Sequence, residues 1–393
     1  MLKPNEIERF SFILQPQLHK LENQIMADIV RRLKINGEIT RSADWQIFRL
    51  SELGAAQKEI ENNLKNSLNF NDEDIKKLYD DIIQKDYARD ANLYKAAGLK
   101  QKEFKDNLWL QQLINTIAIQ TTGELKNITQ SMGFSVKNLD GSLSFLPIAD
   151  YYQNTLDNAV LGISSGAFDY NTVLKKTVAE MTSSGLRTIE YASGWTNRTD
   201  VAVRRAIMTG LSQITANISD SNAEELGTDM FEVTWHSGAR PTHQTWQGGW
   251  YTKKQLETIC GLGTGPGLCG WNCYHNYYPV IPGISTPTYT KEQLKEMNRE
   301  ENKQTEYNGK AYTKYQALQR QRNLETTMRA QRQKIKLLEE GGAAENDIIA
   351  ARCRYRGTSQ EYTEFSKAMG LPQQRERVTI DGLGNIGVGK YKT

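Results

Sequence analysis

Hydrophobic residues recur with a helical period along most of this chain, and the period changes in one central segment. Over residues 4–35 the apolar positions are three or four residues apart: Ile13, Leu14, Leu18, Leu21, Ile25, Ile29 and Leu33. This spacing places them on one face of a helix. From Met230 onward, Phe231, Val233 and Trp235 alternate with other residues, which predicts a β-strand. We therefore expect a mainly α chain with a small β-containing module, an α+β protein with long amphipathic helices at both ends.

Further amphipathic segments and their end signals extend this helical pattern. The segments predicted to be helical are residues 42–68, 71–86, 105–129, 169–185, 199–218, 290–304, 312–341 and 361–370. Polar N-terminal signals and glycines at C-termini accompany them at Asn71–Asp74, Asp169 or Asn171, Gly185, Thr290 with Gln293, and Gly341. Residues 187–191 are predicted as a short strand or a helix extension, and residues 248–255 as a second strand.

Shifts in composition predict three regions. The Asp140–Gly141 turn signal follows the first helical third and marks a boundary. Five of the seven tryptophans fall between Trp195 and Trp271, so this glycine-rich part is expected to be packed, because aromatic side chains bury large areas. We predict an N-terminal helical region at 1–135, a compact Gly/Trp-rich module at 136–288, and a basic helical region with a tail at 289–393. Residues 381–393 are expected to be a flexible or docking end.

Charge and hydrophobicity exclude several classes of protein. The formal net charge is only +3, so overall charge favours neither nucleic acid nor membrane as a partner. No stretch approaches the roughly 18 apolar residues of a membrane span. The N-terminus has acidic residues and a proline where a signal peptide has an apolar run. Four cysteines are too few for a disulfide scaffold of this size, which favours a chain made in a reducing cytoplasm.

Three of those cysteines lie close to a histidine in the glycine-rich module. Cys260, Cys269, Cys273 and His275 have the residue types of a closed zinc site, with His243 or His236 as alternative ligands. Against this, Cys273 and His275 are two residues apart, and such side chains point opposite ways in an extended chain. Buried cysteines that act as small hydrophobic residues, or a disulfide, are the alternatives.

Other chemistry has weaker support in the sequence. A cysteine with His243 or His236 as its base would make a thiol hydrolase, but no known nucleophile signature surrounds any cysteine. The glycines at 261–270 lack the Lys-Ser/Thr of a phosphate-binding loop and are expected to permit tight turns instead. A basic helix offers a solvated face or, alternatively, a contact to DNA phosphates through Arg320, Arg322, Arg329 and Arg332.

Two segments together carry a resemblance to a known family. They are "VTWHSGARPTHQTWQG" at 233–248 and "GTGPGLCGWNCYHNYYPVIPGIS" at 263–285. They resemble the phage minor capsid protein 2 family of tailed phages of Gram-positive bacteria, which are relatives of the MuF-like head-morphogenesis proteins. The resemblance covers most of residues 145–380. The residues of the family motif that we single out are His236, Arg240, His243, Trp246 and Asn272.

The resemblance implies a structural role without catalysis. It implies a low-copy protein of a tailed-phage head, associated with the portal and inner capsid and acting in head assembly, DNA packaging or ejection. The implied partners are the portal protein, major capsid or scaffold proteins, and packaged double-stranded DNA, with no membrane. The implied location is the virion head, after synthesis in the host cytoplasm. No cofactor is expected beyond a structural zinc. The alternative is a cysteine- or metal-dependent hydrolase built on the Cys/His cluster.

Overall fold

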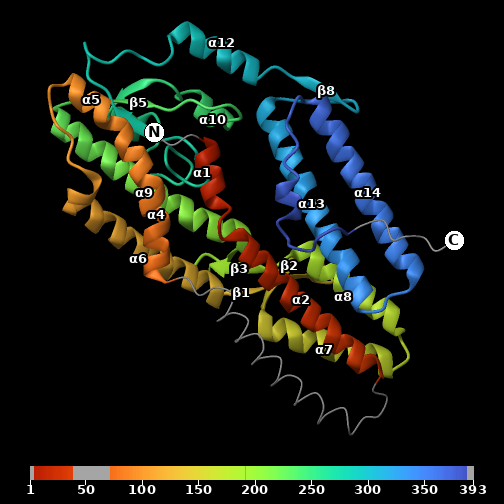
Figure 1. Ribbon diagram of the computed structural model, residues 1–393. Helices are drawn as coiled ribbons and strands as arrows, with labels where there is room; N and C mark the ends of the chain where they lie inside the picture. The colour runs from red at the N-terminus through yellow and green to blue at the C-terminus, as the bar shows by residue number, and fades with distance from the viewer. Residues whose placement is uncertain (1–3, 39–70, 191, 387–393) are drawn as a thin grey trace. The chain divides into compact units, whose positions relative to one another are not determined.

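The computed structural model describes residues 4–38, 71–190 and 192–386, which form mainly helices and small antiparallel sheets (Figure 1). This confirms the expected α+β fold class. The helix predicted at residues 42–68 lies outside the described residues. The chain divides into two compact units, each built from separate stretches. Unit 1 comprises residues 1–13, 70–126 and 203–319, and unit 2 comprises residues 14–69, 127–202 and 320–393. The region boundaries predicted from composition stay predictions.

Unit 1 contains a helical part and a small sheet with its connections. Its helices are α1 (Pro4–Ser11), α4 (Asp72–Tyr87), α5 (Ala91–Ala96), α6 (Leu108–Gln130, as far as Lys126), α9 (Thr199–Leu226, from Val203), α10 (Pro241–Gln244), α11 (Lys253–Thr258) and α12 (Lys291–Glu301). Its strands are β5 (Met230–Val233), β6 (Trp250–Thr252), β7 (Tyr277–Pro279), β8 (Thr305–Tyr307) and β9 (Lys310–Tyr312). The three-stranded sheet has the order β6-β5-β7, and β8 and β9 form a separate hairpin.

Tyrosines join the helices of unit 1 to one another. Tyr79 of α4 is fully buried, and its hydroxyl lies 2.9 Å from the Thr121 hydroxyl of α6 and donates to the Ile207 carbonyl of α9 at 3.2 Å. Tyr94 of α5 donates to Asn222 of α9 at 3.0 Å. Buried hydroxyl groups need such partners, so these bonds help to fix which helices pack together.

The sheet of unit 1 packs its central strand into an apolar core. Phe231 and Val233 of β5 are almost fully buried and pair across the sheet with residues of β6 and β7. The core cluster around them consists of Ala223, Trp246, Leu256, Cys260, Leu268 and Tyr277. The alternation seen at Phe231 and Val233 therefore does belong to a strand.

Unit 2 consists of a four-stranded antiparallel sheet and long helices. Its helices are α2 (Gln15–Glu38), α7 (Ile148–Ser164), α8 (Tyr170–Ser184), α13 (Lys314–Glu340, from Arg320), α14 (Glu345–Ala368) and α15 (Glu376–Thr379). Its strands, β1 (Met132–Lys137), β2 (Leu143–Pro147), β3 (Arg187–Glu190) and β4 (Trp195–Arg198), have the order β2-β1-β3-β4. α13 and α14 run side by side in opposite directions (Figure 1), and the buried Tyr362 hydroxyl of α14 donates to Glu325 of α13 at 3.0 Å.

Most end signals in the sequence occur where they were predicted. Asn71 and Asp169 accept from Asp74 N–H at 2.8 Å and Thr172 N–H at 3.0 Å as N-caps. Thr290 forms the capping box of α12. Gly185 ends α8 with a φ of +64°, a conformation that glycine adopts without a steric penalty. Gly341 follows the last residue of α13.

Three predicted elements need correction, and one open alternative is resolved. The helix expected at 4–35 is interrupted by a turn at 12–14, where Ile13 is 50% exposed instead of buried. Residues 187–190 form a strand, which confirms the first of the two alternatives predicted for residues 187–191. In 248–255 the strand ends at Thr252, whose side chain caps α11. The helix predicted at 361–370 is the C-terminal end of the much longer α14. The first half of α14 was not predicted because it is polar and lacks a clear apolar stripe.

No helix among the described residues is long and apolar enough to cross a membrane.

Candidate metal centre

The glycine-rich loop between α11 and β7 folds back on itself. A Cβ at Gly267 would lie 2.0 Å from the Gly261 carbonyl oxygen, and one at Gly270 would lie 2.2 Å from that of Gly265. These are closer than any real Cβ contact, so both positions require glycine. The glycines therefore allow the tight turns that the sequence predicts. Trp271, by contrast, is 59% exposed and does not pack in the core.

A turn brings Cys273 and His275 to the same side of the loop. Asn272 has a φ of +52°, and Cys273 N–H donates to the Gly270 carbonyl at 3.1 Å. His275 N–H then lies 3.4 Å from the Cys273 sulfur. Because the chain is turned here and not extended, the objection that these side chains point opposite ways does not apply.

Three donor atoms from two motif segments converge in unit 1. The Nδ1 atoms of His243 and His275 are 3.3 Å apart. The Cys273 sulfur lies 3.8 Å from His243 Nδ1 and 3.5 Å from His275 Nδ1. All three side chains are buried, and their donor atoms lie within 4.8 Å of one another. Of the predicted ligand set, Cys273 and His275 are brought together, with His243 as the third donor.

Cys260 and Cys269 occupy different positions from Cys273. Cys260 is 1% exposed within the apolar core cluster and lies outside the three-residue group. Burial raises its pKa to about 12, as expected for a cysteine that packs as a small hydrophobic residue. Cys269 also lies outside the three-residue group; its sulfur donates to the His275 carbonyl at 3.5 Å, and the Cys273 sulfur lies 3.9 Å from the same oxygen.

His236 stacks against the cluster. Its ring lies 3.9 Å from the His275 ring, centre to centre. Its Nε2 atom is buried and has no hydrogen-bond partner among the described residues. Burial lowers the pKa of His236 to about 4.

Burial controls the charge state of the cluster. It lowers the pKa of His243, and that of His275 well below its usual value, so both imidazoles are neutral at neutral pH. It raises the pKa of Cys273 and, to well above the usual value, that of Cys269. A catalytic thiolate needs the opposite environment, in which a nearby cation lowers the thiol pKa. Neutral imidazoles are the form of histidine that binds metal.

The remaining motif residues hold the two segments together. Arg240 donates to the Trp271 carbonyl at 2.6 Å. The Trp246 ring is buried beside the imidazoles of His243 and His275. Asn272 accepts from Arg204 of α9 at 3.1 Å. The motif is thus a single spatial cluster.

Sequence reasoning missed the groups that orient the two imidazoles. His243 Nε2 lies 2.8 Å from the Pro266 carbonyl, and His275 Nε2 lies 3.0 Å from the side-chain amide of Gln247, which presents its oxygen or, when reversed, its nitrogen. The position of Gln247 within the motif was a signal for its role. Nothing in the sequence points to a carbonyl at Pro266.

Two of the four arginines proposed as DNA contacts are buried and paired inside unit 2. Arg332 is buried and forms a two-point ion pair with Asp381, at 2.6 and 3.0 Å. Arg329 donates to the Arg377 carbonyl at 2.8 Å and is 12% exposed. These two guanidinium groups are not presented to phosphates, which corrects the prediction for both. Arg320 pairs with Glu361 and is partly exposed. A DNA contact at Arg320 and Arg322 stays a prediction.

The Asp381 pair favours docking over flexibility, the two alternatives predicted for the tail, at its first residue. Asp381 is 2% exposed, and its backbone oxygen accepts from Asn23 of α2 at 2.8 Å. The segment 381–386 is therefore packed in unit 2 at its first residue, Asp381. Residues 387–393 lie outside the described part of the chain.

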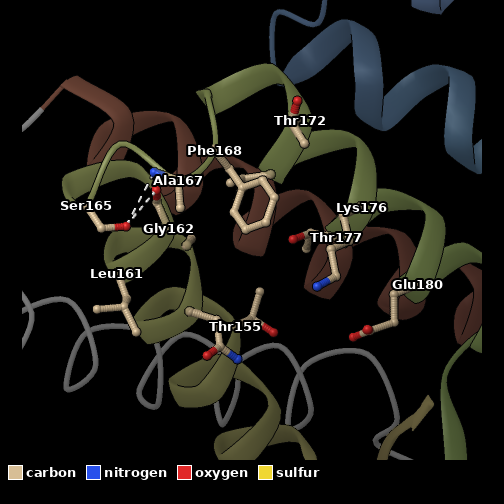
Figure 2. A pocket seen from close by; sticks show the side chains of 13 residues that line it. Thr155, Leu161, Gly162, Ser165, Ala167, Phe168, Thr172, Lys176, Thr177 and Glu180 are labelled. Carbon is tan, nitrogen blue, oxygen red and sulfur yellow. Dashed lines mark hydrogen bonds between the residues drawn. The ribbon is translucent and has the colours of Figure 1, made fainter. Parts of the chain in front are cut away.

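Unit 2 has a cavity of about 480 Å³ between α7 and α8 (Figure 2). The exposed ring of Phe168, with Lys176 and Glu180 of α8, lies around it. None of its described lining residues is a cysteine or a histidine. It therefore has no part in the donor cluster of unit 1.

Comparison with known proteins identifies the class of this chain. Residues 2–367 match the family described as phage minor capsid protein 2. The chain is 23% identical over 263 residues to a structural protein of Lactococcus phage LL-H. The aligned region covers 62% of this chain and 67% of that protein. No solved structure matches the chain.

These findings define a structural protein of a phage particle. More specifically, the chain belongs to the phage minor capsid protein 2 family. This confirms the resemblance read from the two motif segments.

Proposed function

We propose that this minor capsid protein is a low-copy component of the phage head, associated with the portal and inner capsid, and that it acts in head assembly, DNA packaging or ejection. The observation that carries the proposal is the family match over residues 2–367, which draws on both compact units. We propose the portal protein and major capsid or scaffold proteins as its partners, with packaged double-stranded DNA as a further contact. It would reach the virion head after synthesis in the host cytoplasm.

The alternative, a cysteine- or metal-dependent hydrolase, has less support. His275, His243 and Cys273 are 1%, 2% and 3% exposed, respectively. A substrate has to reach the atoms that react with it, and these donors are enclosed. The cluster is better suited to holding the fold together than to turnover.

Quantitative mass spectrometry of purified virions tests the location. We expect the protein in every preparation, at far fewer copies than the major capsid protein. Cross-linking of intact heads should then join its lysines to the portal protein. Absence from purified particles, or a copy number equal to that of the major capsid protein, would overturn the proposal.

A nonsense mutation in the gene, with complementation in trans, separates the proposed steps. Aberrant heads indicate a role in assembly, empty normal heads a role in packaging, and full but non-infectious particles a role in ejection. Normal, infectious particles without the protein would contradict all three roles.

A further inference from the structure

The separations within the donor cluster match the edges of a zinc coordination tetrahedron. With zinc bonds of about 2.0 Å to nitrogen and about 2.3 Å to sulfur, a tetrahedral site has N–N edges of about 3.3 Å and N–S edges of about 3.5 Å. The cluster has an N–N separation of 3.3 Å between His243 and His275, and N–S separations of 3.5 and 3.8 Å to Cys273. One ion can therefore bind all three atoms without a large rearrangement.

The partners of the outer ring nitrogens favour the same conclusion. The Pro266 carbonyl can only accept, so His243 carries its proton on Nε2 and directs the lone pair of Nδ1 into the cluster. A hydrogen bond of this kind from the second ring nitrogen is typical of metal-binding histidines.

The Gln247 side chain determines the corresponding state of His275. With its oxygen toward His275 Nε2 at 3.0 Å, that oxygen also accepts from His236 N–H at 3.3 Å. The reversed amide donates to His275 Nε2 at 3.0 Å and to the His236 carbonyl at 3.2 Å and accepts from Trp235 Nε1 at 2.9 Å, so it satisfies both ends of the Gln247 side chain without a metal. Only the first orientation leaves His275 Nδ1 free to bind a metal.

When both imidazoles carry their proton on Nε2, the Nδ1 lone pairs of His243 and His275 face each other across 3.3 Å in a buried environment. Without a cation, the Cys273 thiol has one proton to offer to two Nδ1 acceptors. Buried polar atoms are costly when unsatisfied, so this state is unfavourable without a cation, and the metal-free chain is expected to adopt the reversed Gln247 amide instead. A cation bound between the three atoms removes this conflict.

We propose that unit 1 binds one structural zinc ion through His243, Cys273 and His275, with Cys269 as the fourth ligand. Cys269 is assigned because its sulfur faces the same His275 carbonyl as the Cys273 sulfur, and thiolates are common in closed zinc sites. Cys260 is not a ligand. On binding, each thiol releases its proton to solvent, and two thiolates with two neutral imidazoles balance the charge of the ion.

The structure also offers a route for the ion and a reason for its presence. Cys269 lines a cavity of about 320 Å³ between α9 and the glycine-rich loop. A metal bound by these residues would tie α10 to the long glycine-rich loop, which forms neither helix nor strand between α11 and β7. The inference does not depend on the proposed role in the head.

Metal analysis of the full-length protein, purified under reducing conditions without chelator, tests the site. We expect about one zinc per chain in the wild type. The stripped protein should bind Co²⁺ with the absorption of a tetrahedral ion bearing thiolate ligands. Zinc should also raise the melting temperature of the stripped wild type. If the wild type contains no zinc and binds no Co²⁺ in this way, the proposal is overturned without recourse to any variant.

Variants identify the ligands. Cys273→Ser and His243→Ala should lose the metal, while Cys260→Ala, a matched buried cysteine, should keep it. Cys273→His retains a donor atom and should therefore keep zinc, with fewer thiolate ligands. This variant distinguishes loss of a ligand in Cys273→Ser from misfolding of that variant. Metal content unchanged in Cys273→Ser would overturn the site. Cys269→Ser should halve the thiolate-to-cobalt absorption per ion, and an unchanged spectrum would remove Cys269 from the set.

Discussion

Gly210 of α9 lies against Tyr79 of α4 and Thr121 of α6. A Cβ at this position would lie 2.1 Å from the Tyr79 hydroxyl oxygen and 2.7 Å from the Thr121 hydroxyl oxygen. The glycine is therefore required by packing between α9, α4 and α6, and not by helix formation. A helical glycine in a sequence usually indicates only a local cost, so this role was not predictable from the pattern of α9 alone.

Gly210→Ala is expected to lower the free energy of unfolding by about 1–3 kcal/mol, because the added methyl group overpacks a buried contact. Gly123→Ala in α6 is the matched control, since a Cβ there meets nothing within 4 Å. The control should be neutral or raise stability by up to about 1 kcal/mol. Urea-induced unfolding measures both. Adding Tyr79→Phe to Gly210→Ala should recover part of the loss, and equal effects of the two glycine substitutions would disprove the packing argument.

At the scale of elements, helix ends were more predictable than helix packing. The capping box at Thr290 depends on residues three apart, and both of its hydrogen bonds form: Thr290 N–H to Gln293 at 2.8 Å and Gln293 N–H to Thr290 at 3.2 Å. The turn that divides α1 from α2 was missed because Ile13 continues the apolar spacing although its side chain is exposed. Periodicity identifies a face, and it does not reveal where the chain leaves the helix.

Thr290→Ala should weaken the N-terminus of α12 by about 1 kcal/mol, because its hydroxyl satisfies a backbone N–H that has no helical partner. Hydrogen exchange of the amides in residues 291–294 should become several-fold faster. Thr290→Ser, which keeps the hydroxyl, is the control and should exchange like the wild type. Equal exchange in the alanine and serine variants would argue against a stabilising cap.

At the scale of a whole unit, buried charges join elements that are distant in the sequence. Glu22 of α2 accepts from Leu186 N–H at 2.7 Å, and Gln333 of α13 donates to it at 3.0 Å. Arg198 lies 3.4 Å from the same carboxylate. Burial by itself raises the pKa of Glu22, but Arg198, His19 and the Leu186 amide together lower it to about 2.

This shift predicts that unit 2 loses stability in acid. The pKa in the folded state lies below the unfolded value of 4.5, so the stabilisation is complete above pH 4.5 and is lost as the pH falls toward 2. The contribution is of the order of 3 kcal/mol. Glu22→Gln should be less stable than the wild type at pH 7 and show a smaller further loss between pH 5 and pH 2.5. Asp150→Asn, at an exposed carboxylate of α7, is the control for the pH series, and parallel curves for wild type and Glu22→Gln would contradict the prediction.

The sequence by itself determined the features that depend on neighbours along the chain. Helical segments, the caps at Asn71, Asp169 and Thr290, and the strand at Phe231 and Val233 follow from local spacing and local hydrogen bonds. The two motif segments also carried the family membership. Such features are predictable because the interacting residues are a few positions apart.

Tertiary structure decided which residues meet in the candidate site and which charged side chains are buried in ion pairs. His243 and Cys273 are thirty positions apart in the chain, and Arg332 and Asp381 are forty-nine apart. The turn at Asn272 brings Cys273 to the side of His275, and the apolar core takes Cys260 away from it. Spacing in a sequence cannot distinguish a cysteine that meets a histidine from one that meets a core, because burial and contact are set by how distant segments pack.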